Sequence, residues 1–357
     1  MIQGKRHHQA TTIRGTIGLL LVLLLAIIAS ACGNNANSGD NAGASASAAS
    51  PSASEAASPS ASAPAASEEP ATLTIKHGFG ETEVPLHPKR VAVIGLEDVM
   101  LSLGTPLVYA YGFDGYYLYD RLKEQNVTLS NSPDTAPNLE GILATQPDLI
   151  VLQQYFTDQA GYEELSKIAP TIAYKPDDWK TSIAEIGKIL GLEDKAQEVI
   201  QANADKIAAA KEQIASAVGT DKTVLYIRPS DKDLQVFFPS FMPLLYEQLG
   251  LNPDTSIADF EKEADADWGV NTSLEKLPAI TADYVFAIYG GSISSKEDYD
   301  KEVAAQSEVE KLQVWQAMPA VQQNHVFKVS ARTWMSSGPI SQSSIIDDVV
   351  SAVVGKQ

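Results

Sequence analysis

The sequence predicts an α/β fold in which two lobes, each built on a parallel β-sheet, are joined by one long rigid helix. Short apolar runs such as 91–94 alternate with helical segments, as in sheets whose strands are buried on both faces. This alternation occurs twice, before and after a stretch from 194 to 218 that contains neither glycine nor proline. Apolar or small residues recur in that stretch at spacings of three and four, which is the period of an α-helix.

Residues 1–31 have the pattern of a secretory signal peptide. Three cations precede an apolar run at 17–28, which at about 12 residues is too short to span a bilayer. Small residues at 29–31 lead to Cys32, the only cysteine of the chain, as in a bacterial lipobox whose thiol receives diacylglycerol. The alternative is an ordinary signal-peptidase site at 29–31 with an incidental cysteine. We expect lipidation at Cys32 and a location on the extracytoplasmic face of the cell membrane.

Residues 32–70 consist almost wholly of Ala, Ser, Pro, Gly and Asn. Such a segment cannot bury enough apolar surface to fold, and the sequence therefore predicts a disordered, lipid-anchored tether. A flexible chain of about 38 residues reaches roughly 30–40 Å.

The charge balance excludes some partners. The chain holds 26 Lys+Arg and 45 Asp+Glu, and three of the cations but no acid lie in residues 1–31. The remaining 23 cations against 45 acids give a net charge of −22. Nucleic acid and anionic lipid would be repelled. Attachment to the membrane therefore depends on the lipid anchor. The two acyl chains of a diacylglycerol anchor a protein stably, whereas a single acyl chain does not.

Residues 71–180 are predicted to form the N-terminal lobe. The lobe begins with a hairpin and continues as alternating strands and helices, which predicts a parallel sheet. The hairpin strands are 72–76 and 83–85. The later strands are 91–94, 107–110, 149–152 and 171–174, and the helices are 97–103, 139–144 and 159–168.

Residues 181–219 are predicted to link the lobes, and 220–357 to form the C-terminal lobe. The linking segment contains a shorter helix ending at Gly191 and the long helix, whose 25 or so residues span roughly 38 Å. The C-terminal strands are 223–228, 234–237, 283–288 and 326–329, and the helices are 241–249, 273–277, 303–316 and 340–354.

Five motifs together resemble the iron-siderophore and cobalamin binding proteins of ABC importers. They occur in that family's order and cover residues 85–350. The motifs are Asn138–Leu143 with Gln146–Ile150, Ser273–Leu277 with Ala282–Phe286, Trp315–Val321 with Asn324–Phe327, Lys89-Arg90-Val91, and Gly338-Pro339.

The resemblance implies a bilobed periplasmic-binding-protein-like fold with a shallow cleft, a binding function and no catalysis. The implied ligand is a ferric siderophore, the implied partner is the permease dimer of an ABC importer, and no cofactor or metal site is expected. We also expect a monomer that binds no nucleic acid. The family's permease-docking glutamates correspond to Glu140 and Glu275. Alternatively, each glutamate lies in the first turn of a helix only because its charge interacts favourably with the helix dipole.

Ligands of open α/β sheets bind beyond the carboxyl ends of the strands, which directs attention to the loops that follow them. The candidate ligand-binding residues there are Tyr116, Tyr117, Tyr155, Arg228, Tyr289, Arg332 and Trp334. Many aromatics and few cations favour a nearly neutral ferric hydroxamate over an anionic catecholate. Each tyrosine could instead be plain packing, and Arg228 could pair with Asp231 or Asp233.

Other functions are weighed against this one. Cobalamin or haem would serve the same transport role. A receptor for a bare metal ion needs several converging His and carboxylate ligands, whereas His77, His87 and His325 precede strands or lie in the hairpin. A cell-wall enzyme would need a nucleophile motif that the sequence does not contain.

Overall fold

The computed structural model describes residues 71–130, 136–175, 178–291 and 295–355. All of them belong to one compact unit. The predicted signal peptide and tether, with the lipidation site Cys32, lie outside the described residues and remain predictions.

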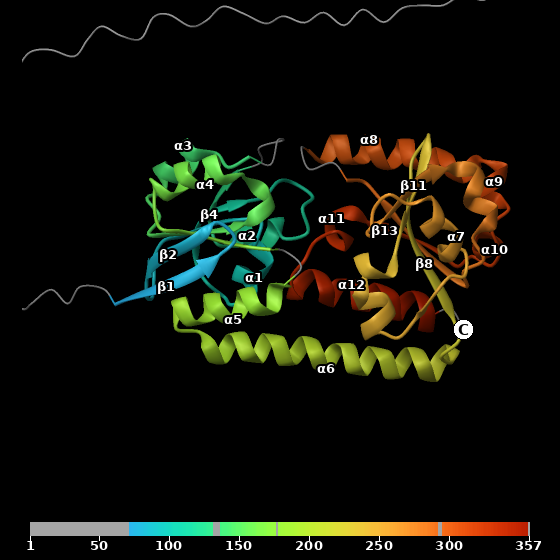
Figure 1. Ribbon diagram of the computed structural model, residues 1–357, viewed down its shortest axis with the longest axis horizontal. Helices are drawn as coiled ribbons and strands as arrows, with labels where there is room; N and C mark the ends of the chain where they lie inside the picture. The colour runs from blue at the N-terminus through green and yellow to red at the C-terminus, as the bar shows by residue number, and fades with distance from the viewer. Residues whose placement is uncertain (1–70, 131–135, 176–177, 292–294, 356–357) are drawn as a thin grey trace, which may run out of the picture. The chain divides into compact units, whose positions relative to one another are not determined.

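The N-terminal lobe is a five-stranded parallel sheet with order β5-β4-β3-β6-β7, preceded by the antiparallel hairpin β1–β2 (Figure 1). The strands are β1 (Thr72–His77), β2 (Gly80–Pro85), β3 (Val91–Ile94), β4 (Leu107–Tyr111), β5 (Thr128–Ser130), β6 (Leu149–Gln153) and β7 (Thr171–Tyr174). The helices are α1 (Glu97–Ser102), α2 (Tyr119–Glu124), α3 (Leu139–Ala144) and α4 (Gln159–Ser166), with the short turn η1 (Gln154–Phe156).

Both faces of this sheet are buried, which explains why its strands read as continuous apolar runs. Along β3, Val91 and Val93 belong to one hydrophobic cluster, whereas Ala92 and Ile94 belong to another. Successive side chains of a strand point to opposite faces, so the two clusters cover the two faces of the sheet.

Two helices connect the lobes. They are α5 (Trp179–Leu190) and α6 (Glu193–Val218), and α6 packs against both α5 and α12 (Pro339–Val354) (Figure 1). The buried residues of α6 include Ala196, Asn203 and Ala210. Their spacing of two helical turns puts them on one face of the helix. The long helix begins at Glu193, one residue before its predicted start, and ends at Val218 as predicted.

The C-terminal lobe has a mixed sheet with order β11-β9-β8-β12-β13, and β10 pairs with β8. Its strands are β8 (Thr223–Pro229), β9 (Asp233–Phe237), β10 (Asn252–Pro253), β11 (Gly269–Ser273), β12 (Tyr284–Tyr289) and β13 (Val326–Ser330). The strands β8, β12 and β13 are parallel as predicted, but β9 and β11 are antiparallel to their neighbours, which corrects the expectation of a purely parallel sheet.

The cause of this difference is the tight connection from β8 to β9. Ser230 donates its backbone N–H to the carbonyl of Asp233, and its hydroxyl accepts the N–H groups of Lys232 and Asp233. So short a loop can join only antiparallel strands, because a parallel crossover needs a dozen or more residues.

The helical segments of this lobe are shorter or more broken than predicted, apart from α12, which matches the helix predicted at 340–354. They are α7 (Ile257–Phe260), α8 (Lys296–Ser307), α9 (Gln313–Gln316), α10 (Pro319–Gln322), α11 (Ala331–Trp334) and α12, with the turns η3 (Pro239–Phe241), η4 (Leu244–Gln248), η5 (Glu261–Glu263), η6 (Leu274–Ala279) and η7 (Glu308–Lys311). The helix expected at 303–316 begins at Lys296, because Ser295 caps it by accepting the N–H of Asp298.

Candidate binding cavity between the lobes

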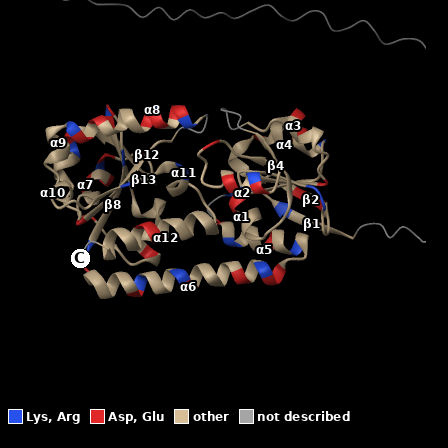
Figure 2. Ribbon diagram, turned by 180° about the vertical axis from the view of Figure 1, so that it is seen from behind, with Lys and Arg blue, Asp and Glu red and all other residues tan. Residues whose placement is uncertain are grey.

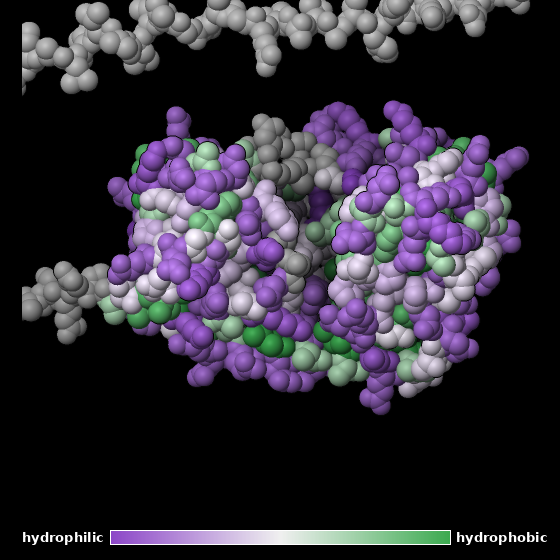
Figure 3. Space-filling view, in the orientation of Figure 1, coloured by the Kyte–Doolittle hydropathy of each residue, from purple (hydrophilic) through white to green (hydrophobic). Residues whose placement is uncertain are grey.

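A cavity of about 360 Å³ lies where the carboxyl ends of the strands of both lobes meet. Figure 3 shows the surface hollowed between the two lobes. In the N-terminal lobe, the residues that line the cavity lie mostly at or after the ends of β3, β4 and β6. In the C-terminal lobe, they lie at or after the ends of β8, β12 and β13. The lining residues are Gly95, Asp98, Tyr111, Phe113, Tyr116, Tyr117, Gln153, Phe156, Arg228, Gly291, Ala331, Arg332, Met335, Ser336 and Ser337.

Aromatic rings form much of the N-lobe wall. The ring of Tyr111 makes edge contacts with Phe113, Tyr116 and Phe156 at centroid distances of 5.8, 6.2 and 5.6 Å. Tyr116 in turn packs against Tyr117 at 4.8 Å. The hydroxyl of Tyr111 is buried and has no hydrogen-bond partner among the described residues. The wall therefore offers apolar ring surface together with one hydroxyl that is available to a ligand.

Arg332 reaches from the C-terminal lobe to the N-terminal one. Its guanidinium lies over the ring of Phe113 at 4.6 Å and over the ring of Tyr299 at 4.1 Å, and its Nη2 donates to the carbonyl of Ser295 at 2.9 Å. Burial lowers the pKa of Arg332 below its usual value. The group remains a cation at neutral pH, held against two aromatic faces.

Arg228 is the second cation of the cavity. Its Nη2 pairs with Oε1 of Glu302 at 3.0 Å, and both side chains are about one-quarter exposed. The sequence-based alternatives Asp231 and Asp233 are not its partner in the structure; Asp233 instead accepts a hydrogen bond from Ser230. Arg228 thus contributes donors to the cavity, while its charge is largely neutralised by Glu302.

Two adjacent carboxyls, Glu97 and Asp98, lie at the start of α1, and Asp98 lines the cavity. Glu97 Oε1 accepts the N–H groups of Gly95 at 2.9 Å and Tyr111 at 3.0 Å, which ties the ends of β3 and β4 together. Asp98 accepts the N–H groups of Ile340 and Ser341 in the first turn of α12, each at 2.8 Å. Asp98 therefore joins the two lobes beside the cavity.

Two glycines allow the backbone to approach its neighbours closely beside Glu97 and Asp98. A side chain on Gly95, whose φ is +81°, would collide with Gln153 and Phe156. A side chain on Gly338 would place its Cβ 2.3 Å from Cγ of Asp98. Without these two glycines, neither the loop after β3 nor the start of α12 could lie so close to its neighbours.

Four of the seven predicted ligand-binding residues line the cavity, namely Tyr116, Tyr117, Arg228 and Arg332. The other three lie elsewhere. Tyr155 is 70% exposed and lies outside the lining, although its neighbour Phe156 is part of it.

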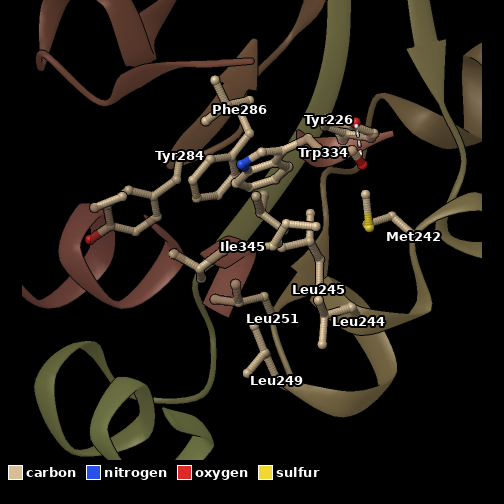
Figure 4. Packing of buried hydrophobic residues seen from close by; sticks show 14 of the residues in the cluster. Tyr226, Met242, Leu244, Leu245, Leu249, Leu251, Tyr284, Phe286, Trp334 and Ile345 are labelled. Carbon is tan, nitrogen blue, oxygen red and sulfur yellow. Dashed lines mark hydrogen bonds between the residues drawn. The ribbon is translucent and has the colours of Figure 1, made fainter. Parts of the chain in front are cut away.

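Tyr289 and Trp334 lie inside the C-terminal lobe. Tyr289 is 3% exposed and donates its hydroxyl to Glu310. Trp334 is 1% exposed, stacks on Phe286 at 4.9 Å and donates its indole N–H to Asp348 at 2.8 Å (Figure 4). A position after a strand was therefore a correct guide to the region, but it did not show which side chains turn inward to the core.

Lining residues that are not among the seven predicted from the sequence include Asp98, Tyr111, Gln153 and Phe156. A usable signal existed for Asp98. Two acids in succession, separated by only two residues from the end of a buried strand, are unusual for a segment that packs against the core.

The two predicted docking glutamates are exposed on different lobes. Glu140 lies in the first turn of α3, whose N-cap Asn138 accepts the N–H of Gly141, and Glu275 lies on η6. Within the described part of the chain, neither side chain forms an ion pair or hydrogen bond. Figure 2 shows the acidic position on α3 as an isolated red segment.

The described residues contain no group of three or more His, Cys, Asp or Glu side chains that could hold a metal ion. Nδ1 of His325 lies 3.0 Å from the carbonyl of Asp283, and its ring stacks on Tyr284. His77 contacts Thr82 and Tyr162.

Among the residues that the structure describes, no helix is both long enough and apolar enough to span a bilayer.

Comparison with known proteins identifies the family. The model of the periplasmic binding protein family matches residues 107–333. This chain belongs to that family. The resemblance inferred from the five motifs is thereby confirmed, as is the predicted bilobed α/β fold class, apart from the antiparallel pairing of β9 and β11.

Its relatives are siderophore-binding proteins by name. The iron(3+)-hydroxamate-binding protein FhuD of Bacillus subtilis is 32% identical over 280 residues, which are 76% of this chain and 82% of the relative. A probable siderophore-binding lipoprotein of the same organism, YfiY, is 27% identical over 288 residues, covering 78% of this chain and 86% of the relative.

Solved structures give the same result. A periplasmic binding protein component of a Fep/Fec-like ferrichrome ABC transporter from Bacillus subtilis superposes with a TM-score of 0.64 at 27% identity, over 78% of this chain and 99% of that one. SirA of Staphylococcus aureus, complexed with staphyloferrin B, has a TM-score of 0.64 at 26% identity, over 80% of this chain and 100% of SirA.

Proposed function

We propose that this chain is the extracytoplasmic substrate-binding lipoprotein of an ABC importer, which captures a ferric siderophore between its lobes and delivers it to a membrane permease. The observation that supports the proposal most is the cavity at the meeting point of the strand ends, walled by aromatic rings and two arginines. The names of the relatives point the same way. The anchor at Cys32 would hold the protein beside its permease.

The charges around the cavity favour a ferric hydroxamate. Arg228 is paired with Glu302, and Asp98 faces the same space as Arg332. A cavity with so little net positive charge is poorly suited to a tris-catecholate complex, which carries several negative charges. A nearly neutral tris-hydroxamate needs only a few donors and apolar contact, which the rings, the Tyr111 hydroxyl and the guanidinium groups would provide.

A direct titration tests the ligand class. Purified protein would be titrated with ferrioxamine B, ferrichrome and ferric enterobactin, with quenching of Tyr and Trp fluorescence as the signal. We expect dissociation constants of about 1 μM or below for the two hydroxamates, and affinity at least about 100-fold weaker for the catecholate.

Two controls define the limits of that test. Desferrioxamine B without iron checks that the ferric complex is recognised, and cobalamin and haem test the other large ligands. Tight binding of ferric enterobactin alone would overturn the hydroxamate assignment. Binding of none of the ferric complexes would overturn the proposed function itself.

Delivery would depend on docking to the permease dimer. We assign this role to Glu140 and Glu275, one carboxylate on each lobe, because both are exposed and carry no internal partner in the described residues. Two carboxylates of this kind could each accept a bidentate pair of hydrogen bonds from an arginine of the permease.

A further inference from the structure

Large exposed apolar side chains are few on the described surface, and one of them lies beside a docking carboxylate. The four are Leu143, Tyr155, Leu312 and Met335, of which Met335 lines the cavity. Leu143 is 59% exposed and lies three residues after Glu140 on α3. Residues three apart on a helix are neighbours on its surface, so α3 presents a carboxylate and a leucine side by side.

The packing of α3 explains why Leu143 cannot be part of the core. Ile142 is fully buried and Leu139 packs against the same cluster, which fixes the inward face of the helix. Leu143 is therefore held outward by its neighbours. A single exposed leucine is ordinary on a protein surface; its position one turn from an unpaired carboxylate is what calls for an explanation.

The C-terminal lobe repeats this combination. Glu275 lies on η6, and η6 packs against α9. Leu312, which is 40% exposed, is the residue immediately before α9. The nearby cation Lys276 is already paired with Glu263 at 2.6 Å, which leaves Glu275 for an external partner. Each lobe thus carries an exposed leucine on the same or an adjoining element as its docking glutamate.

An exposed ion pair alone is a weak contact. It changes an association equilibrium by about fivefold or less, because water and salt screen it. Burying one leucine side chain can change the same equilibrium by about tenfold or more. An apolar contact beside the pair would also exclude water from it and strengthen the electrostatic attraction.

We propose that Leu143 beside Glu140, and Leu312 at the start of the helix that packs against the element of Glu275, form the apolar half of a two-point docking surface for the permease. Each leucine would enter an apolar recess next to the cationic group that receives the glutamate. The occupant is a membrane permease whose extracytoplasmic face combines an arginine or lysine with such a recess. This inference rests on the proposed transport function.

Uptake in whole cells tests the proposal with the full-length, anchored protein. A strain of the source organism that lacks the chromosomal copy would carry the wild type, Leu143→Ser, Leu312→Ser or both changes, expressed at equal levels. Initial uptake of ⁵⁵Fe-labelled ferrioxamine B would be measured at a saturating concentration. We expect about a tenfold loss of rate for Leu143→Ser and a larger loss for the double variant.

Matched variants separate docking from ligand binding and from folding. Leu143→Met keeps an apolar side chain and should restore at least half of the wild-type rate. Dissociation constants for ferrioxamine B and thermal midpoints of the purified variants should equal those of the wild type. A double-mutant cycle of Leu143→Ser with Glu140→Gln should show non-additive effects, as expected for side chains that contact one partner site.

The possible failures are distinguishable. If Leu143→Ser transports within twofold of a wild type that binds and imports the probe, the docking surface is refuted and the proposed function stands. An equal fall in ligand affinity would also refute it. If the wild type neither binds nor imports any ferric siderophore, the proposed function itself is overturned.

Discussion

Glu97 has the lowest exposure of any acidic or basic side chain in the described part of the chain, at 1%. Burial raises the pKa of its carboxyl to about 7, although two backbone N–H groups donate to it and favour the charged form. One of its oxygens, Oε2, has no partner among the described residues. Burial therefore favours the neutral form of this carboxyl below about pH 7.

The raised pKa of Glu97 predicts how stability depends on pH. The unfolded state releases this proton near pH 4.5, whereas the folded state keeps it until about pH 7. The stabilisation is thus complete below the unfolded pKa and is lost as the pH rises through the folded pKa. We expect the Glu97→Gln variant to lose less stability than the wild type between pH 5 and pH 8. Urea unfolding at both pH values measures this, and identical pH profiles would contradict it.

Two residues of α11 show what the sequence did not predict about the site. Arg332 and Trp334 lie two positions apart on α11, and both were expected to bind ligand. Arg332 lines the cavity, whereas Trp334 stacks against Tyr226 and Phe286 in the core (Figure 4). Residues two apart on a helix face different directions. The sequence did not reveal that a helical turn follows β13, so the two side chains could not be separated.

At the scale of elements, the α12 helix depends on the other lobe for its N-terminal cap. Its N-cap residue Gly338 has no side chain, and the carboxylate of Asp98 on α1 takes that role by accepting two first-turn N–H groups. The hydroxyl of Tyr117 donates to the same carboxylate at 2.8 Å. One buried side chain thus joins α1, α12 and the cavity wall.

Removal of this carboxylate should weaken the connection between the lobes. Asp98→Ala would leave two N–H groups and one hydroxyl without an acceptor, and we expect a loss of roughly 2–4 kcal/mol in the free energy of unfolding. Asp98→Asn keeps one acceptor oxygen and should lose less. Urea unfolding gives the magnitude, and amide hydrogen exchange at Ile340 and Ser341 reports the local effect. Unchanged exchange at these amides would show that Asp98 does not cap the helix.

The elements that were predicted well are those fixed by local pattern. The strands β3, β6 and β12 are examples, because each contains an uninterrupted apolar run in the sequence. Contacts far apart in the sequence then join these strands to their neighbours, since Asp148 accepts the N–H groups of Lys89 and Arg90, and Asp283 accepts that of Thr223.

The strand at 234–237 was predicted, but its antiparallel direction was missed because the tight turn from Ser230 to Asp233 was not recognised. Strand β11 was missed because its sequence, GVNTS, contains no apolar run.

At the scale of the whole molecule, the acidic surface and the proposed docking points belong together. Figure 2 shows acidic segments on the helices of both lobes, while the cations shown are mostly close to acids. Many of the lysines indeed form ion pairs with acids three or four positions away along the chain. Unpaired acids such as Glu140 and Glu275 are then the groups left to meet a basic permease.

Neutralising both docking glutamates should abolish delivery but not capture. Each carboxylate would accept charge-assisted hydrogen bonds from the permease, and the exposed leucine of the same lobe would exclude water from them. We therefore expect Glu140→Gln or Glu275→Gln alone to slow uptake of ⁵⁵Fe-ferrioxamine B by about tenfold, and both together by about 100-fold. The dissociation constant of the purified double variant should stay within twofold of the wild type, because neither residue lines the cavity.

Glu164→Gln, which neutralises an exposed acid already paired with Lys167, is the matched control and should transport normally. A double variant that imports at the wild-type rate would exclude these glutamates from docking. One that binds ferrioxamine B weakly would instead place them in ligand capture.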